Sequence, residues 1–173
     1  MKLYRTKIPV IAKETVDTLC TDGDIEVEPN NREEAEQDLV AIMEEFMRRD
    51  FSFRNKIKDH MSSRRIPYDR YGEVRKQMAD QMNHPYGDDI ERFLARQFVE
   101  NLMISRFIEE VYEEDKVLYK KVLGILKMHH VDEREIREEA LSKIKNVREG
   151  TVDFEIALNN AVKEVKRRKG LLT

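Results

Sequence analysis

Apolar residues recur along most of the chain at intervals of three and four positions, which is the spacing of one face of an α-helix. The first such stripe runs from Ile8 to Leu19 and predicts a helix that ends near Cys20. Strand-like alternation is scarce, apart from a short extended piece at residues 25–27. Only 6 Gly and 4 Pro interrupt the pattern, which favours a protein built almost entirely from helices.

Local signals place the other helices of the first half. Asn31 and Asp50 each carry a side-chain oxygen that can accept from free helix amides, so we predict a second helix after Asn31 and a third after Asp50. The sequence 62–67 ends the third helix, because the residue before a proline disfavours the helical conformation. A fourth apolar stripe runs from Tyr71 to Met82.

The sequence also resembles itself when it is shifted by 83 positions. Apolar residues of the first half then fall on apolar residues of the second: Ile11 on Leu94, Ala12 on Ala95, Val16 on Val99, Leu19 on Leu102, Ile25 on Ile108, Leu39 on Val122 and Met43 on Leu126. We therefore predict an all-α fold of two similar four-helix units that arose by internal duplication and pack together. The units are residues 1–83 and 84–173, divided by a cluster of turn-forming residues at 83–89.

The second unit repeats the plan with four apolar stripes, at 90–102, 118–126, 136–147 and 154–165. Thr151 or Asp153 caps the last helix, and Gly170 ends it.

Composition places the chain among folded cytoplasmic proteins. It is 40% hydrophobic and 39% charged, so a core exists but must be thin. The single cysteine, Cys20, cannot form an internal disulfide and fits a reducing compartment. No apolar run has the length of a signal peptide or approaches the roughly 20 residues that cross a bilayer. These features predict a cytoplasmic protein with no membrane partner.

Charge is strongly segregated within the first unit, although the net charge of the chain is only -3. Residues 22–45 hold ten acids and one base, whereas residues 48–76 hold ten bases and four acids. The bases form a candidate binding surface for the phosphates of RNA or DNA, and they are Arg48, Arg49, Arg54, Lys56, Lys58, Arg64, Arg65, Arg70, Arg75 and Lys76.

A second interpretation of this segregation is that adjacent helices of opposite sign neutralise each other, and on the sequence alone we favour it. Phe51, Tyr68 and Tyr71 lie among the bases. Aromatic residues at helical spacing are more often core residues than stacking platforms, so we expect them to be buried.

No motif for catalysis, metal binding or nucleotide binding stands out. The adjacent pair His129-His130 would diverge by about 100° on a helix and lacks the spacing that makes ligands converge on one metal ion. Cys20 has no histidine near it in sequence and is expected to be an inert, buried thiol. We therefore predict no catalytic residues, no metal and no cofactor.

Three segments resemble a bacterial family, the one known as domain of unknown function 507. They are Lys2-Leu3-Tyr4-Arg5-Thr6-Lys7-Ile8-Pro9, Gly23-Asp24-Ile25-Glu26-Val27, and Val152-Asp153-Phe154-Glu155 through Lys169-Gly170-Leu171-Leu172. The resemblance spans essentially the whole chain. It implies a bacterial cytoplasmic protein, assigns no catalytic residues and disfavours an enzyme.

Together these features predict a non-catalytic helical protein that binds or scaffolds a protein partner. A repeated helical unit would offer two related surfaces to such a partner, and a homo-oligomer stays open. The alternative is an RNA-associated or ribosome-associated factor that binds phosphates through the basic surface at 48–76. Exposure of the ten bases, or their pairing with the acids at 22–45, distinguishes the two.

Overall fold

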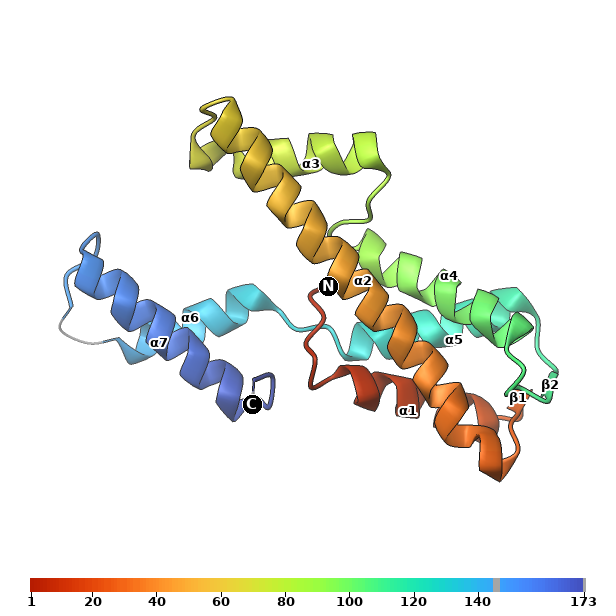
Figure 1. Cartoon of the computed structure of the whole chain (residues 1–173). Helices are drawn as coiled ribbons and strands as arrows, with labels where there is room; N and C mark the ends of the chain where they lie inside the picture. The colour runs from red at the N-terminus through yellow and green to blue at the C-terminus, as the bar shows by residue number, and fades with distance from the viewer. Residues whose placement is uncertain (145–146, 173) are drawn as a thin grey trace.

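The computed structural model describes residues 1–144 and 147–172, which are mostly helical (Figure 1). The α-helices are α1 (Ile8–Thr21), α2 (Arg32–Ser63), α3 (Tyr71–Met82), α4 (Asp89–Ile104), α5 (Asp115–Met128), α6 (Glu133–Lys143) and α7 (Val152–Arg168). Two short strands, β1 (Ile25–Glu26) and β2 (Glu110–Val111), and 3-10 turns at Pro29–Asn31 and Tyr68–Arg70 complete the described elements. The predicted all-α class is confirmed.

A main body forms from α1, α4, α5 and the N-terminal half of α2. Helix α1 packs on α2, α4 packs on α5, and each pair also contacts the other. The two strands pair antiparallel, with Ile25 opposite Val111 and Glu26 opposite Glu110. One apolar cluster fills the centre of this body and draws its residues from both halves of the sequence, between Leu3 and Phe46 and between Ile90 and Leu126.

The succession of helix, strand and helix occurs twice in the main body, as α1–β1–α2 and α4–β2–α5. Residues matched by the shift of 83 positions are buried in the same cluster, Ile11 with Leu94 and Met43 with Leu126 among them. The four-helix plan does not recur in both halves, because the described part of 1–83 holds three α-helices and that of 84–173 holds four. The internal duplication itself stays a prediction.

The predicted break at Asp50 is wrong, because α2 runs through this position as one helix of 32 residues. Phe46 and Phe53 lie seven residues apart on the same buried face, so the stripe continues without a change of phase. The Asp50 carboxylate caps no helix, since it pairs with Nη2 of Arg54 at 3.0 Å and lies 3.2 Å from Nε2 of His84. Asn31 precedes α2 as predicted, but its side chain makes no capping hydrogen bond.

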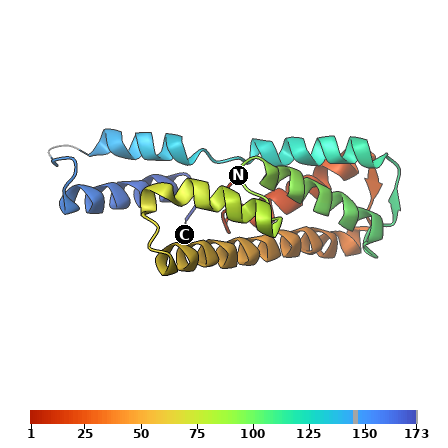
Figure 2. The same cartoon turned by 90° about the horizontal axis from the view of Figure 1, so that it is seen from above.

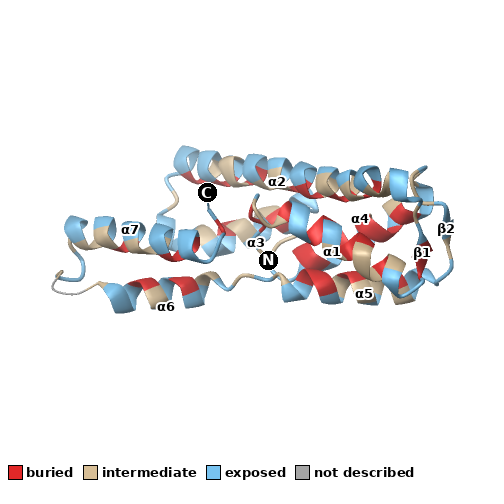
Figure 3. Cartoon of the chain, turned by 90° about the horizontal axis from the view of Figure 1, so that it is seen from below, coloured by how far each residue is buried: buried red, intermediate tan, exposed pale blue. Residues whose placement is uncertain are grey.

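Two helical hairpins extend from the same end of the main body and diverge from each other (Figures 1 and 2). The first, here called the basic arm, consists of residues 47–83 and pairs the C-terminal half of α2 with α3 around a cluster that includes Phe53, Ile57 and Val74. The second, the C-terminal arm, pairs α6 with α7. In both arms the buried residues line the inner faces, while the outer faces are exposed (Figure 3).

The N-terminal segment, residues 1–7, joins the main body to the C-terminal arm. Leu3 is buried in the central cluster, whereas Tyr4 is buried in the cluster of the C-terminal arm together with Leu171. Thr6 Oγ1 donates a hydrogen bond of 2.9 Å to the carbonyl oxygen of Gly170. This segment therefore fixes the base of the C-terminal arm against the body.

The ends of the C-terminal helices largely follow the sequence. Thr151 caps α7, because its Oγ1 accepts from the backbone amide of Phe154 at 3.2 Å. Helix α7 ends before Gly170, which has a φ of +66°. Helix α6 ends at Lys143, short of the predicted end at Val147, and residues 145–146 lie outside the described residues.

Candidate functional site

The ten bases predicted from the sequence all lie on the basic arm or at its base. Eight of them are exposed on its outer surface: Arg48, Arg49, Lys56, Lys58, Arg64, Arg65, Arg70 and Lys76. The other two, Arg54 and Arg75, are half-buried at the base of the arm, where they line a cavity. The structure thus separates the predicted set into an exposed surface and an inner pair.

The acids at 22–45 do not neutralise these bases. Six of the ten acids and five of the ten bases lie on α2, with the acids toward its N-terminal end in the main body and the bases toward its C-terminal end in the arm. Across the described residues, Arg48 is the one base of the set that pairs with an acid from 22–45, which is Glu45, three residues earlier on the same helix. The interpretation favoured from sequence, neutralisation between neighbouring helices, is therefore wrong.

Some of the acids at 22–45 pair with residues of the main body instead of with the ten bases. Asp24 is buried and pairs with Nζ of Lys121 on α5 at 2.6 Å. Asp38 accepts a hydrogen bond of 2.6 Å from Oγ of Ser105. Both contacts lie within the main body and connect its elements. These acids therefore do not offset the positive charge of the basic arm.

Two aromatic residues of the basic arm are exposed, contrary to expectation. The exposed fraction is 63% for Phe51 and 80% for Tyr68, which stacks on Tyr71 with 5.5 Å between ring centroids. Phe53, two positions after Phe51, is only 2% exposed and packs against the ring of His84. An exposed aromatic ring among cations is the combination that proteins use to stack unpaired bases of nucleic acids.

A hollow of about 540 Å³ lies beside Phe51. Arg48 and Arg54 flank the ring on α2, and Arg5 faces it from the N-terminal segment, with Glu44 as the single acid of the lining. A neutral planar group could stack on the ring while its attached anion meets a guanidinium group.

A groove of about 810 Å³ runs along the N-terminal segment between α2 and α7. Its lining carries four cations, which are Lys2, Arg5, Lys163 and Lys166. The groove shares Met47 with the hollow beside Phe51, so the two are neighbours. Sequence reasoning missed this groove, because its walls come from segments more than a hundred residues apart.

The histidines at 129 and 130 serve the joint between α5 and α6. His129 Nε2 lies 2.6 Å from the carboxylate of Glu14 on α1. His130 Nδ1 lies 2.8 Å from the carboxylate of Glu91, which is buried on α4. Each imidazole is engaged with its own carboxylate, and no group of three metal-binding side chains occurs among residues 1–144 and 147–172.

Cys20 is half-buried on α1. Burial raises the pKa of its thiol, and nearby Asp17 acts in the same direction, while Arg32 partly opposes them. A raised pKa leaves less thiolate at neutral pH, so this sulfur is a poor nucleophile.

Comparison with known proteins gives a family and no activity. None of the described helices combines the length and apolar character needed to span a membrane. No curated protein matches this chain. The sequence model of the family described as "Protein of unknown function (DUF507)" matches residues 1–171, nearly the whole chain. The chain therefore belongs to the DUF507 family.

Proposed function

We propose that this protein is a non-catalytic, cytoplasmic binding protein whose ligand is single-stranded RNA, held on the basic arm. The observation that carries the proposal is the exposure of Phe51 and Tyr68 within a surface of eight exposed bases. Cations hold a strand through its phosphates, and exposed rings select a strand whose bases are unpaired and free to stack.

The placement of charge supports an oriented complex. Exposed bases gather on the arm, whereas the exposed acids Glu33 and Glu34 lie at the other end of α2. A polyanion is attracted to the arm and repelled from the acidic end, so it approaches one side of the molecule.

The proposal replaces the protein partner that the sequence favoured, because eight of the ten bases are exposed and only Arg48, among the described residues, pairs with an acid from 22–45. Two further parts of the proposal rest on sequence alone. The cytoplasmic location follows from the lone cysteine and the lack of long apolar runs. The origin of the body in a duplicated helical unit follows from the match at 83 positions.

Fluorescence anisotropy with a labelled single-stranded RNA of about 12 nucleotides, a length within the site sizes of known single-strand binders, tests the proposal. Affinity should fall steeply with salt, with a log–log slope no steeper than about -5.6, because eight exposed bases can each contribute about -0.7. Duplex RNA of the same sequence should bind more weakly, since its bases cannot stack on the protein.

Charge reversal then locates the site. Arg64→Glu with Arg65→Glu should abolish binding, because both side chains are exposed on the arm. The matched control is Arg96→Glu with Lys120→Glu, which makes the same change in charge on exposed positions of the main body. Equal losses in the two double variants would overturn a site on the arm. RNA binding that is absent or insensitive to salt would overturn the proposal. A protein recovered with this chain from extract after nuclease treatment would then favour a protein partner.

A further inference from the structure

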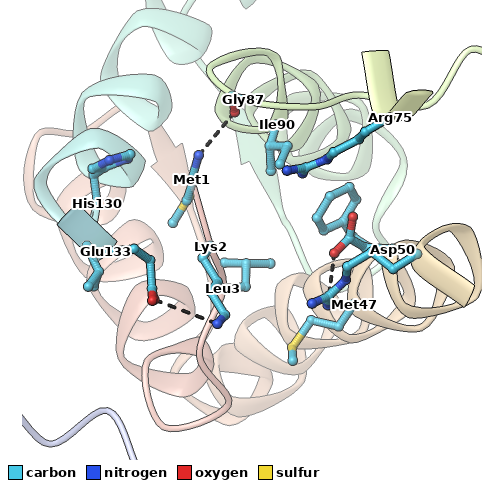
Figure 4. A pocket seen from close by; sticks show the side chains of 13 residues that line it. Met1, Lys2, Leu3, Met47, Asp50, Arg75, Gly87, Ile90, His130 and Glu133 are labelled. Carbon is cyan, nitrogen blue, oxygen red and sulfur yellow. Dashed lines mark hydrogen bonds and ion pairs between the residues drawn. The ribbon is translucent and has the colours of Figure 1, made fainter. Parts of the chain in front are cut away.

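A cavity of about 350 Å³ lies where the basic arm, the main body and the joint before α6 meet (Figure 4). The N-terminal segment, α2, α3, the start of α4 and residues 130–133 all contribute to its lining. This volume is near the lower end of the range for small-molecule sites, about 300–1,000 Å³. It suits a phosphate with its sugar and is too small for a folded polymer.

Two guanidinium groups in this cavity have hydrogen-bond donors without acceptors. The Nε atoms of Arg54 and Arg75 are buried, and neither has a hydrogen-bond partner among the described residues. Nη2 of Arg54 is held by Asp50 at 3.0 Å. In Figure 4 the side chain of Arg75 extends from α3 into the cavity. Buried donors without partners are rare in folded proteins, so their presence indicates an acceptor that the protein itself does not supply.

The charges around the cavity leave an excess of two positive charges. Its cations are Lys2, Arg54, Arg75 and the N-terminal ammonium group of Met1, against the carboxylates of Asp50 and Glu133. Nζ of Lys166 lies 2.9 Å from one oxygen of Glu133. Nζ of Lys2 lies 3.7 Å from the other oxygen, Oε1, which is buried and accepts no hydrogen bond from the described residues. Each carboxylate is therefore already engaged by at least one cation.

Neighbouring positive charges also act on Lys2, although burial has the largest effect on its pKa. Burial lowers its pKa below the ordinary value for lysine, and the positive charges of Lys166 and Arg54 lower it further, although Glu133 acts in the opposite direction. An anion beside this ammonium group would relieve that repulsion.

We propose that this cavity binds the terminal phosphate of a single-stranded RNA, an inference that rests on the proposed RNA-binding function. A phosphomonoester carries about -1.5 to -2 charges at neutral pH, which matches the excess of two, whereas an internal phosphodiester carries one. Its three free oxygens can accept from both Nε atoms. Arg54 lines both this cavity and the hollow beside Phe51, so a strand stacked on Phe51 ends within reach of the cavity.

The test uses four forms of one single-stranded RNA in the anisotropy assay, which carry a 5′-phosphate, a 3′-phosphate, both or neither. A terminal phosphate should tighten binding at least about tenfold, as expected for one or two charge-assisted hydrogen bonds. The preferred end, 5′ or 3′, gives the direction of the strand. Equal binding of all four forms overturns this inference and leaves the proposed function standing, whereas binding of none overturns the proposed function itself.

Variants then assign the effect to the cavity through the ratio of the two affinities, with and without the phosphate. Arg75→Gln should reduce the ratio to about one, as should Lys2→Gln, which serves if the first variant folds poorly. Lys58→Gln, on the exposed surface of the arm, should weaken all forms and keep the ratio unchanged. A ratio that survives both cavity variants overturns the site. Inorganic phosphate that raises the melting temperature while all RNA ends bind equally shows a free-phosphate site and also overturns the inference.

Discussion

Phe51 and Phe53 allow a direct comparison between a ring with a proposed role in binding and a ring with a role in stability. They are two positions apart on α2, they are chemically identical, and their exposed fractions are 63% and 2%. Phe51→Ala should therefore weaken RNA binding without unfolding the protein, and Phe53→Ala should do the reverse.

The structure sets the size of each effect. Loss of one ring that stacks on a base costs about 1–3 kcal/mol of binding free energy, which weakens the affinity by about 5- to 150-fold. Loss of a buried phenylalanine costs about 3–5 kcal/mol of unfolding free energy, or roughly 6–20 °C of melting temperature for a chain of this size. An exposed substitution changes the unfolding free energy by only about 0.5 kcal/mol. The two variants thus differ in both measurements and in opposite directions.

The assays are thermal unfolding by circular dichroism and anisotropy with single-stranded RNA, both on the full chain. Binding by Phe51→Ala that equals the wild type, in a protein with an unchanged melting temperature, would refute the stacking role. A melting temperature lowered as far by Phe51→Ala as by Phe53→Ala would refute the assignment of the two faces of α2. Phe51→Tyr is the control, because it keeps the ring and should keep most of the affinity.

Two further predictions concern stability. The hydrogen bond to buried Asp24 raises the pKa of Lys121 above the ordinary value of 10.5, and the bond to Asp22 adds to this. A raised pKa means that the stabilisation is fully present below about pH 10.5 and is lost as the pH rises through the higher value of the folded state. Urea unfolding at pH 9 and pH 11.5 should show this loss, and Lys121→Met should show a smaller one; identical pH dependence in both proteins would contradict it. Thr151→Ala should lower the unfolding free energy by about 0.5–2 kcal/mol, because the amide of Phe154 loses its acceptor. Thr151→Ser keeps the cap and should stay near the wild type in the same thermal melts.

The sequence pattern predicted those features of the fold that depend on residues close together in the chain. The apolar stripes located most of the helices, the proline at 67 located the end of α2, and Thr151, one of the two predicted caps, lies at the start of α7. Asp50 was misassigned because its partner His84 is 34 positions away. The identity of Asp50 as a common capping residue gives no information about His84. The continuous buried face of α2 outweighs the local preference of Asp50 for a helix start.

The candidate site also depends on contacts between distant residues, which the sequence pattern could not predict. The ten bases could be identified from sequence, but their exposure could not, because the acids at 22–45 could have faced them from another helix. Phe51 and Phe53 read alike in the sequence, and only the packing of α3 on one face of α2 distinguishes them. The cavity escaped prediction because Lys2, Arg75 and Glu133 meet through tertiary packing alone.

Helix α2 extends from the pair of strands to the tip of the basic arm without a break. At 1.5 Å per residue, the 17 residues beyond Phe46 form a lever of about 25 Å, so a tilt of about 10° at its root carries the tip through about 4 Å. Phe46 lies at that root and is buried in the central cluster. A force on the tip, such as the proposed RNA ligand would exert, is thus transmitted to the central cluster, because α2 is unbroken between Phe46 and the tip.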